Sequence, residues 1–215
     1  MPVICQQLIP ANAGLATYNV AKELARQTVA QFGAVRWIGV GIAGASCCAA
    51  LAINPAPAAF FPAGNPLMGF LPPPAGVGVI SVPNFGVPAL PYAIVYGNSQ
   101  LAPGGLALGP LGGHAERAAL TASVAAGMPL PLYLLPAGGH AVLFVELHPC
   151  PGCLTWLNGG GGGVGNPYNG IINTGGATTL DVWWKWPHPA GVGQMNMFHQ
   201  QGLAAQLAQI NGPTW

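Results

Sequence analysis

Charged side chains are scarce in this chain. Of its 215 residues only five are Lys or Arg and four are Asp or Glu, and none of these nine lies between Arg36 and Glu116. Disordered chains combine high charge with few apolar residues, whereas 52% of this chain is hydrophobic. With 33 glycines and 23 prolines, the composition predicts an ordered, loop-rich protein whose poorly solvated surface is covered by a partner.

A basic surface is also missing. Proteins that bind long stretches of nucleic acid neutralise phosphates with clustered Lys and Arg, but the formal net charge of this chain is only +1. This low net positive charge argues against tight, extended binding of a polynucleotide. It leaves open a pocket that admits a single base.

The cysteines do not form the pattern of a disulfide framework. Three of the five, Cys5, Cys47 and Cys48, lie outside the motif described below, and two of them are adjacent. We expect buried thiols in a reducing compartment. The start of the chain is a poor fit to a signal peptide, because no basic segment precedes an apolar core.

The first 75 residues predict an apolar helical and Pro/Ala-rich N-terminal extension. Residues 12–32 carry apolar side chains at a helical period. Residues 37–53 contain no charge, which favours a buried or partner-covered helix; contact with a membrane is the alternative. Residues 54–76 are rich in Pro, Ala and Gly and predict a linker. The boundary therefore falls between residues 1–75 and a domain at 76–215.

Residues 76–215 alternate between strand and helix patterns. Strands are predicted at 77–82, 92–96, 141–147 and 178–186, helices at 113–126, 150–157 and 198–210, and a flexible glycine loop at 158–169. Such alternation predicts an α/β layered domain.

Two short motifs carry the chemistry, His114-Ala115-Glu116 and Pro149-Cys150-Pro151-Gly152-Cys153. Catalytic zinc has three protein ligands and one open position. His114, Cys150 and Cys153 supply one imidazole and two thiolates, and one helical turn can aim both sulfurs at one point. Glu116, two residues after His114, can reach the open position without being a ligand. A structural zinc site would need a fourth protein ligand.

The segment from Gly113 to Leu157 resembles the cytidine deaminase-like superfamily. Its form, HAERAAL followed by ELHPCPGC, is similar to the deaminases of bacterial polymorphic toxins, and also to the zinc motifs of tRNA adenosine deaminases and AID/APOBEC enzymes. The resemblance implies a three-layer fold with a central mixed sheet of about five strands flanked by helices. It implies Zn²⁺ held by His114, Cys150 and Cys153, and Glu116 as the catalytic proton shuttle.

The resemblance also implies hydrolytic conversion of cytosine to uracil in nucleic acid, with DNA favoured over RNA and a single flipped or unpaired base as the target. A toxin of this kind is secreted or delivered into a target cell, acts in the cytoplasm and has an immunity protein as partner. Two alternatives stay open. The missing basic surface supports a free cytidine or deoxycytidine deaminase, and the apolar N-terminal part suits a non-catalytic zinc-bearing interaction module.

Contacts to the substrate are predicted at Asn98 and His148. Asn98 follows a predicted strand and precedes the metal helix, with simple turn chemistry as its alternative role and Asn84 as a weaker candidate. His148 adjoins the metal ligands and can contact the base or a phosphate, or only support the ligands. Pairing with Glu146 on the same strand face is a structural explanation for His148, and His140 is predicted to be a strand-end residue only.

Strand alternation separates the tryptophans of the last predicted strand into two pairs. Trp184 and Trp186 share one face and are expected in the core. Trp183 and Lys185 share the other, and we expect them on the solvent side as contacts for nucleic acid, because bases stack on exposed aromatic rings.

Overall fold

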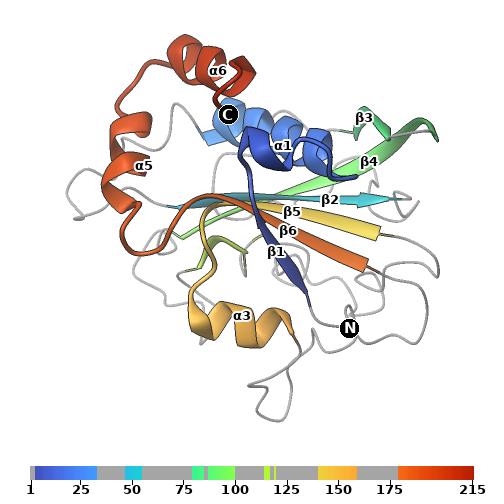
Figure 1. Cartoon of the computed structure of the whole chain (residues 1–215), viewed down its shortest axis with the longest axis horizontal. Coiled ribbons are helices and arrows are strands. Elements are labelled where there is room, and N and C mark those ends of the chain that lie inside the picture. Colours follow the sequence, from blue (N-terminus) through green and yellow to red (C-terminus); the bar gives the residue numbers. More distant parts are fainter. Residues whose placement is uncertain are drawn as a thin grey trace, which may run out of the picture.

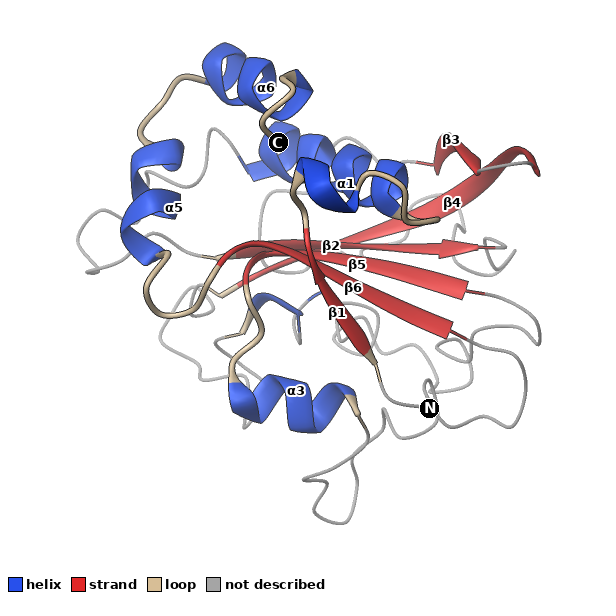
Figure 2. Ribbon diagram, in the orientation of Figure 1, coloured by secondary structure: helices blue, strands red, loops and turns tan. Residues whose placement is uncertain are grey.

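The computed structural model describes residues 3–32, 47–54, 79–84, 87–99, 114–116, 119, 140–158 and 179–215. Its described strands form one mixed sheet with helices on both sides, as Figures 1 and 2 show. The strands are β1 (Ile4–Gln7), β2 (Cys48–Asn54), β3 (Val79–Asn84), β4 (Val87–Asn98), β5 (His140–Leu147) and β6 (Thr179–Trp186). The helices are η1 (Pro10–Asn12), α1 (Tyr18–Phe32), α3 (Pro151–Leu157), α5 (Val192–His199) and α6 (Leu203–Asn211). The predicted α/β class with a mixed sheet is thereby confirmed.

The sheet has six strands in the order β1-β6-β5-β2-β4-β3, one more than the predicted number of about five. The pairs β1–β6 and β6–β5 are parallel, and the pairs β5–β2, β2–β4 and β4–β3 are antiparallel. The predicted strands at 77–82, 92–96, 141–147 and 178–186 correspond to β3, β4, β5 and β6. The parallel half of the sheet is the half that leads into the metal motif.

Strand β5 lies in the middle of the sheet because its sequence is apolar on both faces. All seven residues from Ala141 to Leu147 are buried, Glu146 among them. A continuous apolar run is typical of a strand that is covered from both sides. The end of β5 is therefore held firmly in the core, and the cysteine motif at 149–153 follows it closely.

The two faces of the sheet are covered differently. Helices α1, α5 and α6 lie over one face, and the shorter helix α3 lies on the opposite side (Figures 1 and 2). Helix α1 presents a buried stripe that includes Val20, Leu24 and Val29, and this stripe joins one core cluster with residues of β2, β5 and β6. We call this side the helical face and the side of α3 the metal face.

The N-terminal residues are part of this fold, which corrects the predicted extension. Strands β1 and β2 and helix α1 come from residues 1–75, yet they belong to the same sheet and core as residues 140–215. The helix predicted at 37–53 is wrong for residues 48–53, which form β2, while residues 37–46 lie outside the described part. Among the described residues, no helix is long and apolar enough to span a membrane.

Two helix boundaries also differ from prediction. The helix expected at 12–32 begins only at Tyr18, because residues 10–12 form a 3-10 turn. The helix expected at 198–210 is two helices, α5 and α6, with a break at residues 200–202 that includes Gly202. Of the predicted helix at 113–126, residues 114–116 and 119 are described; residues 115, 116 and 119 are helical, and His114 precedes them outside the helix.

Candidate metal centre

The two cysteines of the motif lie where β5 passes into α3. Pro151 is the first residue of α3, a position that needs no backbone N–H and for which the ring fixes φ suitably. The carbonyl oxygen of Cys150 accepts a hydrogen bond from the Leu154 N–H at 2.9 Å, which closes the first helical turn. Cys150 and Cys153 are therefore held on one turn, half-buried and fully buried respectively.

His114 approaches the cysteines from a separate helical turn. Ala115 and Ala119, four residues apart and thus on one helix face, are each 1% exposed. The small alanine side chains let this turn pack closely, so His114 is carried to the cysteines from a segment more than thirty residues earlier.

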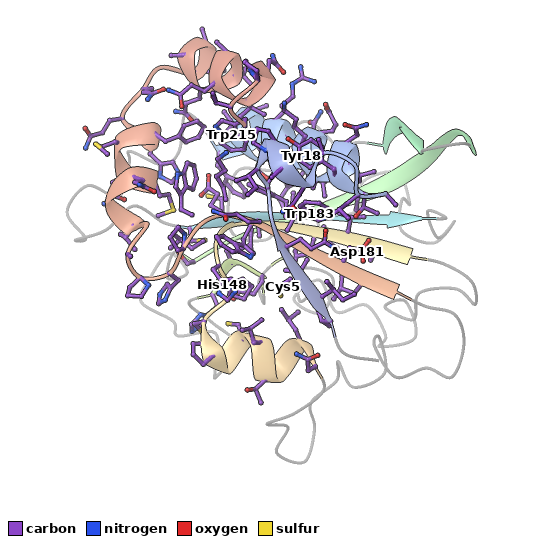
Figure 3. The ribbon with its side chains drawn as sticks, in the orientation of Figure 1. Cys5, Tyr18, His148, Asp181, Trp183 and Trp215 are labelled. Atoms are coloured by element: carbon purple, nitrogen blue, oxygen red, sulfur yellow. The ribbon has the colours of Figure 1, made fainter. Side chains whose placement is uncertain are left out.

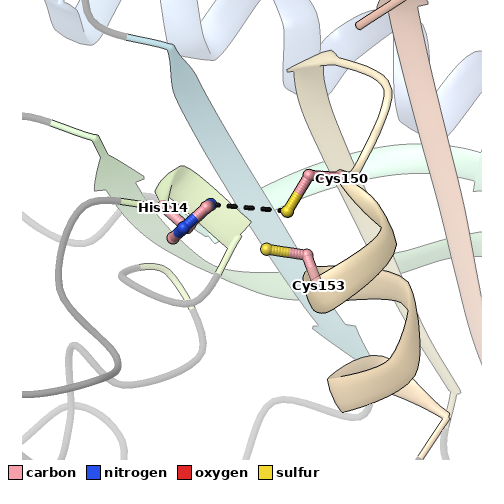
Figure 4. Close-up of side chains that lie close together, drawn as sticks. All are labelled: His114, Cys150 and Cys153. Carbon is pink, nitrogen blue, oxygen red and sulfur yellow. Dashed lines mark hydrogen bonds between the residues drawn. The ribbon is translucent and has the colours of Figure 1, made fainter.

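The three side chains converge on one point, as Figure 4 shows. The Nδ1 atom of His114 lies 3.8 Å from the Sγ of Cys150, and the ligand atoms of all three residues lie within 4.8 Å of one another. Tetrahedral zinc with bonds of about 2.3 Å to sulfur and 2.0 Å to nitrogen places its ligand atoms roughly 3.5–3.8 Å apart. The predicted clustering is confirmed, and this donor set could hold a metal ion.

The group offers three ligating residues and not four. Within the described ranges, His114, Cys150 and Cys153 are the only set of His, Cys, Asp or Glu that meets the geometry of a metal site. Structural zinc sites are normally closed by four protein ligands, whereas catalytic sites keep one position open. The described group supplies three of the four ligands that a tetrahedral zinc ion takes.

Glu116, two residues after His114 in the same helical segment, is buried, with 4% of its surface exposed. Its carboxylate charge acts on two thiols that lie outside the motif. Burial first, and then the charge of Glu116, raises the pKa of the Cys5 thiol to about 11. Burial, followed by the charges of Glu146 and Glu116, raises the pKa of Cys47 well above its usual value. Both thiols therefore stay protonated at neutral pH, and protonated thiols are poor metal ligands.

His148 and Trp184 form an aromatic pair beside the metal ligands. Their ring centroids are 4.8 Å apart at 83°, an edge-to-face contact, and both side chains are half-buried. Figure 3 places His148 and Cys5 on the side of the sheet that α3 occupies. In the β5–β6 register Trp184 pairs with Val145. The aromatic neighbour of His148 is thus Trp184, and the predicted contact of His148 with the substrate stays a prediction.

Trp183 and Lys185 lie on the helical face, which contradicts their predicted role at the solvent side. Trp183 is fully buried, donates its Nε1–H to the Thr17 hydroxyl at 2.9 Å and packs edge-on against Tyr18. The Lys185 ammonium donates to the Leu8 carbonyl and lies 4.3 Å from the Trp215 ring centroid. Trp183 therefore belongs to the core, and because Trp186 packs against Phe198 and Trp215 in the same core cluster, the predicted division of this strand into a core face and a solvent face is wrong.

Trp186 is 8% exposed and belongs to the core, as predicted. Asn98 is the last residue of β4, opposite Cys48, and His140 is the first residue of β5. Their side chains and that of Asn84 lie outside the described part of the structure, and so does the glycine run at 159–163. Their predicted roles stay predictions.

Sequence reasoning missed the partner of Glu146. The carboxylate does not pair with His148; its Oε1 lies 3.0 Å from Nε2 of His199 in α5, and its Oε2 accepts the backbone N–H of Cys48 at 2.9 Å. Both side chains are 1% exposed. His199 is 53 residues away from Glu146, so no local spacing could have indicated this pair.

Comparison with known proteins gives no relative for this chain. No family model, no curated protein and no solved structure matches it. The side chains of the site are therefore the basis for a functional proposal.

Proposed function

We propose that the protein is a zinc-dependent deaminase that hydrolyses the exocyclic amine of cytosine in nucleic acid, with DNA favoured over RNA. The observation that carries the proposal is the convergence of one imidazole and two thiols within 4.8 Å, and a buried carboxylate, Glu116, follows the imidazole residue by two positions. This combination of an incomplete ligand set and a separate acid–base group is what hydrolytic deamination of a base requires.

His114, Cys150 and Cys153 would hold the ion. A zinc ion in such a site lowers the pKa of water to about 7 and so supplies a nucleophile at neutral pH. Glu116 supplies the proton transfers. It accepts the first proton of the water and gives it to the ring nitrogen N3, then accepts the second from the new hydroxyl group on C4 and gives it to the amine. A C–O bond forms at C4, the C4–N bond breaks, and the amine leaves as ammonia.

The aromatic pair His148–Trp184 supports a small, flat substrate group. The rings of His148 and Trp184 meet edge to face, so each half-buried ring can contact a base that enters toward the metal. The net charge of +1 favours contacts to one extruded base over a long phosphate track. A free nucleoside has no phosphate to neutralise, so the scarcity of Lys and Arg makes it the second candidate substrate.

The test is deamination by wild-type protein and by Glu116→Gln, both loaded with zinc. We expect ammonia release from cytosine-containing single- or double-stranded oligonucleotides by the wild type. Glu116→Gln should lose at least about 10²–10³-fold in turnover, because the amide cannot accept a proton. Glu23→Gln is the matched control; it removes a carboxylate on α1 that pairs with Arg26 on the surface. It should keep full activity.

Three outcomes separate the alternatives. Activity on cytidine alone would move the assignment to a free nucleoside deaminase. Equal zinc content and equal biological effect in wild type and Glu116→Gln would instead favour the non-catalytic interaction module.

Delivery as a toxin, action in the cytoplasm of a target cell and protection by an immunity protein are proposals that rest on the resemblance. Growth arrest on cytoplasmic expression of the wild type, absent with Glu116→Gln, would support them.

A further inference from the structure

We propose that the buried pair Glu146–His199 is a positioning device for the metal centre, which fixes the end of β5 that delivers Cys150. The inference rests on the proposed metal site but not on the identity of the substrate. Neither residue is a ligand or touches the reacting atoms. They act through the backbone that carries the ligands.

One carboxylate joins three elements of the fold. Oε1 of Glu146 accepts from Nε2–H of His199, which ties β5 to α5, and Oε2 accepts from the Cys48 N–H, which ties β5 to the first residue of β2. With both side chains 1% exposed, water cannot replace either bond. A buried carboxylate that loses its partners is costly, so this arrangement is held strongly in one geometry.

Glu146 lies shortly before the two cysteine ligands in the chain. Glu146 precedes Cys150 by four residues, and between them the His148 N–H donates to the Trp186 carbonyl of β6 at 2.8 Å. The segment is thus held from β2 and α5 through Glu146 and from β6 through His148. Metal ligands need placement to within about 0.5 Å, and the final residues of β5 receive that placement from both neighbouring strands.

The same carboxylate also holds the start of β2. It accepts the N–H of Cys48, which directly follows Cys47. The backbone of Cys47 is fixed in turn by Ser99, through its hydroxyl at 2.9 Å and its N–H at 2.8 Å. Loss of Glu146 would therefore release the start of β2 as well as the end of β5.

The experiment uses the full chain loaded with Co²⁺, whose visible absorption reports the ligand geometry at the site. Glu146→Ala removes both hydrogen bonds. Glu146→Gln keeps an oxygen for the Cys48 N–H and offers an N–H to the other tautomer of His199. Asp181→Ala is the matched control; Asp181 accepts from the Thr17 hydroxyl at 2.8 Å on the helical face, at the other end of β6.

We expect Glu146→Ala to weaken Co²⁺ binding by about tenfold or more and to change the cobalt spectrum, with Glu146→Gln within about threefold of wild type. Asp181→Ala should lower the unfolding temperature but leave affinity and spectrum unchanged. If Glu146→Ala does not fold, His199→Asn, which keeps the Cys48 bond, is judged by the same criteria.

Wild-type affinity and spectrum in Glu146→Ala, or equal changes in Asp181→Ala, would overturn the positioning role while leaving the proposed function intact. A wild-type chain that binds no Co²⁺ would instead overturn the metal site, and the inference with it.

Discussion

The two faces of the sheet are built from different kinds of side chain. On the helical face, aromatic rings pack closely: Trp186 lies 5.1 Å and Trp215 lies 5.5 Å from Phe198, centroid to centroid. On the metal face lie the imidazole of His114 and the thiols of Cys150 and Cys153, and the rings of His148 and Trp184 form an edge-to-face pair. The helical face supplies stability by burying apolar area, whereas the metal face holds groups that are costly to bury and useful in chemistry.

Trp183 and Trp184 show the contrast within one strand. They are adjacent on β6, yet Trp183 is fully buried against Tyr18 while Trp184 is half-buried against His148. Because strand side chains alternate, adjacent residues of β6 lie on opposite faces of the sheet. One face contributes to stability, and the other is the proposed site of function. Substitutions on the two faces should therefore have separable effects, and four of them test that separation.

The largest effect is expected for loss of a metal ligand. Cys153→Ser removes a fully buried sulfur from the group of three. We expect the zinc content, measured by mass spectrometry of the metal, to fall well below one per chain, and turnover to be lost. His188→Ala, at an exposed histidine of the loop after β6, should keep both. Full zinc content in Cys153→Ser would show that this sulfur is not a ligand.

On the helical face, Trp183→Ala should act on stability alone. Removal of a fully buried indole leaves a cavity and typically costs about 3–5 kcal/mol of the free energy of unfolding. Urea unfolding measures that loss. Zinc content should stay at the wild-type level where the variant is folded, and a loss of zinc at full folding would break the separation of the two faces.

On the metal face, Trp184→Ala should act on the substrate. Loss of one stacking ring costs about 1–3 kcal/mol per base, so we expect KM for an oligonucleotide to rise by about tenfold with a smaller change in kcat. The destabilisation should be less than that of Trp183→Ala. An unchanged KM would remove the aromatic pair from the substrate site.

The smallest effect concerns the pH dependence of stability. Burial, and then the charge of Lys22, lowers the pKa of Lys185 from 10.5 to about 8. Between these two values the unfolded chain binds more protons than the folded chain, so stability from this group rises with pH. We expect the wild type to gain stability relative to Lys185→Met between about pH 8 and 10 in urea unfolding. A constant difference across that window would contradict the assigned environment.

Local patterns predicted the metal ligands and the central strands. Cys150 and Cys153 share one helical turn. The apolar run of residues 141–147 has the length of a buried strand and is shorter than most helices, so it predicts a strand. Strand β1 escaped prediction because Gln6 and Gln7 are polar, which an edge strand tolerates. Strand β2 contains three alanines, which suit a helix as well.

Features that depend on distant residues could not be predicted from the sequence. The buried face of Trp183 is decided by α1, which lies more than a hundred residues earlier in the chain. The pair Glu146–His199 joins elements 53 residues apart. Hydrophobic periodicity gives the alternation of a strand but not which side other elements will cover.

The central claim is an open metal site formed by His114, Cys150 and Cys153. X-ray absorption at the zinc edge of the wild-type protein tests it most directly. We predict two sulfurs at about 2.3 Å, one imidazole nitrogen at about 2.0 Å and one light-atom ligand from outside the three residues. A spectrum with three or four sulfurs would mean that a further cysteine closes the site, and would contradict a catalytic metal.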